Sequence, residues 1–99
     1  MAASHLSPAE IKKLPEILPL WRLDDAAKMI ARDFKFADFK AAFAFMTKVA
    51  TEADRRDHHP DWTNVYNRVT IRLTTHDAGG LTQKDLDLAD FIDKVCELS

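Results

Sequence analysis

The chain has 99 residues, of which 46% are hydrophobic and 30% charged, with a formal net charge of −2. This composition is typical of one small globular domain, residues 1–99, and gives no reason to expect binding to nucleic acid or to an anionic membrane. No apolar run is long enough to span a bilayer, no signal segment is recognisable, and the single cysteine, Cys96, excludes an internal disulfide bond. We therefore expect a cytoplasmic protein.

The N-terminal third of the chain predicts a short helix followed by two strands. Residues 7–10 (SPAE) combine a capping serine, a proline in the first turn and a glutamate that can complete a capping box. Pro15 should end this helix early, because proline cannot continue it. Residues 19–23 and 27–36 follow as strands, the second with apolar residues at every other position and Arg32 as an interruption.

A long helix follows, with Asp38 as its N-cap and its end near Asp57. Apolar residues recur at spacings of three and four, which predicts an inward stripe of about five turns. The members of this stripe are Phe39, Ala42, Phe43, Met46, Val49, Ala50 and Ala53. Phe45 lies off the stripe, so we expect it to be exposed and available for self-association.

The C-terminal part predicts one or two strands and a last helix. Residues 68–75 alternate between apolar and polar, a short strand could precede them at residues 65–66, and glycines make a turn at residues 78–80. Thr82 and Asp85 form a second capping box, followed by an inner stripe of Leu88, Ala89, Ile92, Val95 and Cys96. The order α-β-β-α-β-β-α predicts an α+β fold, in which an antiparallel sheet of about four strands carries three helices on one face.

Three of the four histidines lie at the two ends of one hairpin-like segment, from Asp54 to His76. His58 and His59 follow the long helix and precede Pro60, which stiffens the loop that holds them. Imidazole can give and take a proton near neutral pH, so the pair could perform acid–base chemistry. Asp54, about one helical turn earlier, could orient an imidazole. The simpler alternative is a pair of loop histidines, one solvated and one hydrogen-bonded.

The strand end at His76 is the second candidate. Thr74, Thr75 and Asp77 supply hydroxyls and a carboxylate beside it, although a lone histidine in such a place is more often structural or exposed. The three histidines could instead bind zinc, but the i, i+4 spacing usual for zinc ligands on a helix is absent.

Three further residues have two interpretations each. Trp21 and Trp62 could stack on a flat ligand, or could belong to the core or the rim of a pocket. Asp85 could be an acidic residue of a site, but its capping box explains it fully. The residues alone therefore predict a small α+β domain with a histidine-lined site.

Residues 57–67 (DHHPDWTNVYN), 73–77 (LTTHD) and 80–82 (GLT) closely resemble the pterin-4a-carbinolamine dehydratase family. The resemblance also covers residues 34–39, 43–47, 85–86 and 88–92, so it spans nearly the whole chain from Trp21 to the C-terminus. It implies a hydro-lyase that removes water from 4a-hydroxytetrahydropterins to give quinonoid dihydropterin, without metal or other cofactor. Such an enzyme recycles the tetrahydrobiopterin-type cofactor of aromatic amino acid hydroxylases.

By position, the resemblance makes His58, His59 and His76 the catalytic histidines. His58 and His76 would be the acid and the base, and His59 would orient and bind the pterin. The residues that match the family's substrate-contacting segments and pocket surroundings are Asp57, Thr74, Thr75, Asp77, Trp21, Asp54 and Asp85. Asp54 stands where many members have glutamate, and Ala78 where some have cysteine.

The resemblance also implies a homodimer or homotetramer. A hydroxylase or a transcription factor is a further partner to consider, because animal relatives bind a homeodomain transcription factor. The alternative function is therefore a non-catalytic protein-binding module, such as a coactivator or dimerisation cofactor. The intact set of three histidines favours catalysis, because a coactivator would have no need to keep them.

Overall fold

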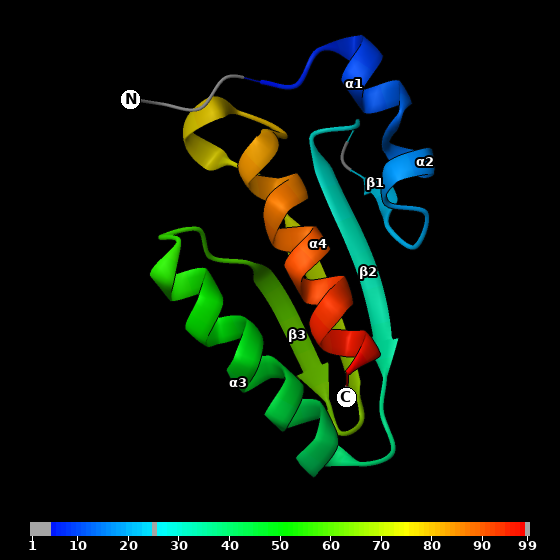
Figure 1. The fold of residues 1–99 in the computed structure, drawn as a ribbon, viewed down its shortest axis with the longest axis vertical. Coiled ribbons are helices and arrows are strands. Elements are labelled where there is room, and N and C mark those ends of the chain that lie inside the picture. Colours follow the sequence, from blue (N-terminus) through cyan, green and yellow to red (C-terminus); the bar gives the residue numbers. More distant parts are fainter. Residues whose placement is uncertain (1–4, 25, 99) are drawn as a thin grey trace.

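Four antiparallel strands form one sheet in the order β1-β2-β4-β3, and the two long helices cover one of its faces (Figure 1). The computed structural model describes residues 5–24 and 26–98. Its elements are α1 (Pro8–Lys12), α2 (Leu14–Ile17), β1 (Arg22–Asp24), β2 (Met29–Lys35), α3 (Phe39–Arg55), β3 (Asp61–Val65), β4 (Arg68–Leu73), the 3-10 helix η1 (His76–Ala78) and α4 (Gln83–Glu97). The predicted α+β fold, with helices on one face of an antiparallel sheet, is confirmed.

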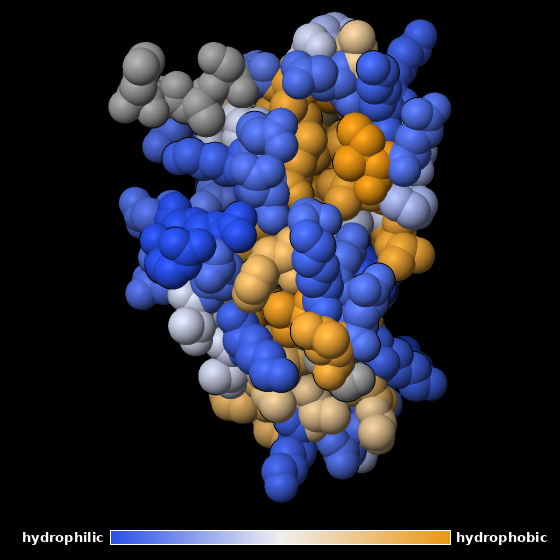
Figure 2. Space-filling view, viewed as in Figure 1, coloured by the Kyte–Doolittle hydropathy of each residue, from blue (hydrophilic) through white to orange (hydrophobic). Residues whose placement is uncertain are grey.

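The core lies between the sheet and α3 and α4. The central strands β2 and β4 are paired so that Ile30 is opposite Leu73 and Phe34 is opposite Val69, and all four side chains are buried. Ile71 is buried between them on the same face, as the alternation in the sequence predicted. Figure 2 shows apolar surface along the middle of the helical face, between mainly hydrophilic margins.

The prediction that Phe45 is exposed is wrong. Its side chain is buried, with its ring 4.9 Å from the rings of both Phe34 and Phe36 at the end of β2. Phe39 and Phe43, which the predicted stripe turned inward, are 46% and 55% exposed and stack on each other at 5.6 Å. The prediction was wrong because apolar residues at spacings of three and four occur on two neighbouring faces of this helix. The face that is buried consists of Ala42, Phe45, Val49 and Ala53.

Some boundaries also differ from the prediction. Pro15 does not end helical structure, because it lies in the first turn of α2, where its missing N–H costs no hydrogen bond. The strand β3 begins at Asp61, four residues before the predicted short strand, and pairs with β4 over its whole length. No helix in the described part of the chain is both long enough and apolar enough to cross a membrane.

Candidate functional site

The paired histidines leave α3 through a Schellman-type turn. The N–H of Asp57 donates to the carbonyl of Asp54 at 3.1 Å, and the N–H of His58 donates to the carbonyl of Ala53 at 3.0 Å. Asp57 has φ 50°, the left-handed conformation that glycine usually provides at this position. This turn gives the next two side chains, His58 and His59, different surroundings.

His58 is buried against the start of α4. Its Nε2 lies 2.6 Å from Oδ1 of Asp85, a side chain with no exposed surface. The other oxygen of Asp85 accepts from the Thr75 hydroxyl at 2.9 Å and from the N–H of Thr82 at 3.0 Å. Asp85 is therefore both the third helical residue of the α4 capping box and the partner of His58.

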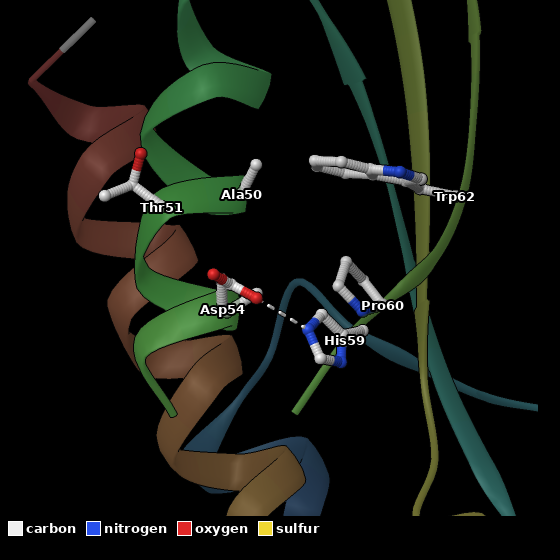
Figure 3. Close-up of a pocket in the computed structure, with 7 residues that line it drawn as sticks. Ala50, Thr51, Asp54, His59, Pro60 and Trp62 are labelled. Carbon is white, nitrogen blue, oxygen red and sulfur yellow. Dashed lines mark hydrogen bonds and ion pairs between the residues drawn. The ribbon is translucent and has the colours of Figure 1, made fainter. Parts of the chain in front are cut away.

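His59 is exposed and points toward α3. Its Nε2 lies 3.2 Å from Oδ1 of Asp54, and both side chains are mostly open to solvent. This contact lies at a hollow of about 570 Å³. Figure 3 shows the contact between His59 and Asp54, and the ring of Trp62 facing Ala50. The hollow is lined by Ala50, Thr51, Ala53, Asp54, His59, Pro60 and Trp62.

A second hollow, of about 230 Å³, gathers all three predicted histidines. We call it the histidine pocket, and its lining consists of Asp57, His58, His59, Thr74, Thr75, His76, Asp77 and Lys84. The hairpin of β3 and β4 brings the two ends of the segment together, and η1 carries His76 at the rim. Seven residues from the sequence analysis therefore meet in one pocket.

Both threonine hydroxyls of this pocket are engaged within the protein. The Thr74 hydroxyl donates to the carbonyl of Lys28 at 2.7 Å, and the Thr75 hydroxyl lies within hydrogen-bond distance of both Asp85 and Thr82. These bonds fix the strand end that precedes His76. The threonines thus shape the pocket wall.

The structure does not bring Trp21 to the histidine pocket. Its side chain is buried, packs edge-on against Phe34 at 6.3 Å, and donates its indole N–H to Asp93 at 2.9 Å. Asp93 also binds Arg32, the cation that interrupts the apolar pattern of β2, at 2.5 Å. A tryptophan whose ring and N–H are both satisfied in the core has no surface for a ligand at this pocket.

Two other residues lie beside the histidine pocket rather than in its lining. Asp54 lines the neighbouring hollow and reaches the pocket through His59, and Asp85 lies behind His58. Lys84 lines the pocket, although the sequence analysis did not select it. The available signal was its position directly before Asp85, in the first turn of the predicted last helix.

A group of charges lies next to this site. Hydrogen bonds from Arg55 and Arg56 to Glu52, with contacts as short as 2.5 Å, lower the pKa of Glu52 from 4.5 to about 2.

Across residues 5–24 and 26–98, no three histidine, cysteine or carboxylate side chains are arranged to hold a metal ion.

The fold and the pocket together define a small α+β protein with a histidine-lined site at the base of a hairpin. Residues 4–95 match the family model described as Pterin 4 alpha carbinolamine dehydratase. The chain belongs to this family, whose members are hydro-lyases.

Proteins of similar sequence and structure match nearly the whole chain. A protein of Rhizorhabdus wittichii named for this dehydratase is 50% identical over 97 residues, which cover 98% of this chain and 100% of the relative. One from Burkholderia vietnamiensis with the same name is 52% identical over 92% of this chain and 89% of its own. The crystal structure of a transcriptional coactivator/pterin dehydratase from Brucella melitensis matches with a TM-score of 0.89 and 38% identity, over 94% of this chain and 99% of that one.

Proposed function

We propose that the protein dehydrates 4a-hydroxytetrahydropterins to quinonoid dihydropterins and so serves the recycling of a tetrahydropterin cofactor. The observation that carries this proposal is the histidine pocket, in which His58, His59 and His76 line one hollow of about 230 Å³. Family membership, at 50% identity over 98% of the chain, supports the same reaction.

The reaction needs two proton transfers, one at the hydroxyl group on C4a and one at the neighbouring N5. The bond between C4a and the hydroxyl oxygen breaks, and its electrons leave with the oxygen, which takes a proton from an acid and departs as water. The N5–H bond breaks as well: a base takes the proton, and the electron pair forms the C4a=N5 double bond. Positioned imidazoles suit both transfers near neutral pH, and each transfer contributes about 10²–10⁴-fold to the rate.

We assign His58 and His76 to the acid and base roles, with His59 binding and orienting the pterin. The bond of His58 to the buried Asp85 supports a fixed ring, with Asp85 as a positioning residue behind it. The pocket's carboxylates, Asp57 and Asp77, are suited to accept hydrogen bonds from the amino and ring N–H groups of a pterin.

The test is the rate of 4a-hydroxytetrahydropterin dehydration, with and without a chelator. We expect a chelator-resistant acceleration, a fall in kcat of about 10²–10⁴-fold in His58→Ala and His76→Ala, and mainly a higher KM in His59→Ala. His5→Ala, outside the pocket, is the matched control and should retain wild-type rates. Loss of turnover at unchanged KM in His59→Ala, with only KM raised in His58→Ala, would reverse the assignment. No acceleration by the folded protein would contradict the dehydratase proposal itself.

A specific surface favours a second property, self-association as a homodimer or homotetramer. Phe39 and Phe43 are stacked and exposed on the outer side of α3, where no element of the described chain covers them. Replacing Phe43 with serine should lower the molar mass measured by light scattering, because the apolar contact is lost. Tyr66→Ser, which alters another exposed aromatic residue, should leave the mass unchanged. A monomeric wild-type protein would contradict this proposal.

The alternative of a protein-binding module rests on the same exposed face. The solved relative from Brucella melitensis is named a transcriptional coactivator/pterin dehydratase. A folded protein without dehydratase activity would favour a binding role for this chain, and the two roles can also coexist.

A further inference from the structure

A cleft lined mainly by cations opens next to the histidine pocket. It has a volume of about 370 Å³ and is lined by Arg55, Arg56, His58, Lys84 and Asp87, which we call the cationic cleft. His58 and Lys84 line the histidine pocket too, so the two hollows are neighbours that share a wall. Figure 2 shows strongly hydrophilic surface over this end of α3 and the start of α4.

The cations of this cleft keep free hydrogen-bond donors. Glu52 binds Nε and Nη2 of Arg55 and Nε of Arg56, which leaves the two terminal nitrogens of Arg56 available. The cleft is lined by three cations and one carboxylate, Asp87, which already accepts a hydrogen bond from Gln83 at 2.9 Å. Two of the cations also pair with Glu52, whereas Lys84 does not.

Lys84 is the most informative of these residues. Within residues 5–24 and 26–98 its ammonium group has no ion pair or hydrogen bond. It lies in the first turn of α4, where the helix dipole disfavours a cation. Helix stability therefore does not explain this lysine, whereas its place between the two hollows suits an anion that enters from the histidine pocket.

The neighbours of the histidine pocket differ in charge. The hollow beside Trp62 offers apolar surface and the carboxylate of Asp54, so it disfavours an anion. The pocket itself offers Asp57 and Asp77, which suit the donor-rich amino edge of a pterin. The C6 substituent of a pterin lies at the end of the ring system away from its amino group, and of the two hollows described beside the pocket the cationic cleft is the one that would attract a negative charge.

Building on the proposed dehydratase function, we propose that the site accepts pterins with an anionic C6 substituent, such as a phosphate ester, and that Lys84 and Arg56 bind that group in the cationic cleft. Lys84 is then a specificity-determining residue at the junction of the ring site and the substituent site. The side chain of Arg56 is held in place by Glu52 and by the ring of Phe91. The centre of that ring lies 5.6 Å from the guanidinium carbon of Arg56.

The experiment compares two probes that share the same pterin ring and differ in the phosphate group at the C6 substituent. Isothermal titration calorimetry measures the Kd of 6-hydroxymethyl-7,8-dihydropterin and of its phosphate monoester, at low and at high salt. We expect the ester to bind about 5–10-fold more tightly, with the preference shrinking at high salt because the cleft is open to solvent. Lys84→Met should bring the ratio of the two constants close to one, and Lys84→Arg should keep it.

Lys94→Met is the matched control, because Lys94 lies on the same helix but pairs with Asp90 outside the cleft. It should retain the preference for the ester. Equal affinity for the two probes in the wild-type protein, or a preference that survives Lys84→Met, would overturn the inference. If the neutral pterin still bound tightly, that result would leave the proposed function standing. Failure of both probes to bind, together with no dehydration, would overturn the proposed function as well.

Discussion

His58 and His59 are neighbours in the sequence, yet their surroundings are opposite. The side chain of His58 is 10% exposed and faces a carboxylate that has no exposed surface, at 2.6 Å. The side chain of His59 is 58% exposed and faces Asp54, which is 86% exposed, at 3.2 Å. The same pair of residue types thus forms one buried, tightly placed contact and one open contact.

The difference shows that the two neighbouring histidines are held by the fold to different degrees. The contact of His58 with Asp85 is part of the cap of α4, so the position of this ring depends on the whole network around Thr75 and Thr82. A contact between exposed groups adds little to stability and is screened by salt, so His59 is free to move toward a ligand. We infer that the site combines a rigid wall at His58 with an adaptable one at His59.

The comparison is tested most strongly by unfolding two variants in urea. His58→Ala removes the partner of a buried carboxylate, so its free energy of unfolding should fall by about 3 kcal/mol. His59→Ala removes an exposed contact and should change the free energy of unfolding by less than about 0.5 kcal/mol. Each variant is the control for the other, because the same substitution is made at adjacent positions.

A double-mutant cycle with Asp85→Asn identifies the source of the larger effect. If the bond of His58 to Asp85 causes it, the two substitutions should be strongly non-additive, with a coupling of about 1–3 kcal/mol. Equal stability of His58→Ala and His59→Ala would contradict the contrast between the buried and the exposed contact.

Much of this arrangement could be predicted from the sequence, because its signals are local. The alternation of residues 68–73 gave the buried face of β4, and both capping boxes form as expected. The meeting of the paired histidines with His76 followed from reading the segment between them as a hairpin. These patterns depend on neighbours within a few residues, or on one turn.

The features that the sequence did not predict are contacts between elements that are distant in the chain. The face of α3 that packs on the sheet depends on Phe34 and Phe36, and no spacing within the helix states that Phe45 fits between them. Trp21 is held by Asp93, which lies 72 positions later. Lys84 was missed for a related reason, since its place beside the histidines depends on how α4 packs against the end of α3.

The turn at Asp57 separates the two histidines, and it offers a smaller test of the same comparison. Asp57 adopts a left-handed φ of 50° and lines the histidine pocket, so the residue that makes the turn is also a proposed contact of the pterin. Asp57→Gly should be more stable than Asp57→Ala by about 1 kcal/mol in urea unfolding, because only glycine adopts this conformation without strain. Both variants lose the carboxylate, so both should raise the KM for the pterin to a similar extent. Equal stabilities would mean that the turn is not left-handed in solution, whereas an unchanged KM in both variants would remove Asp57 from substrate binding.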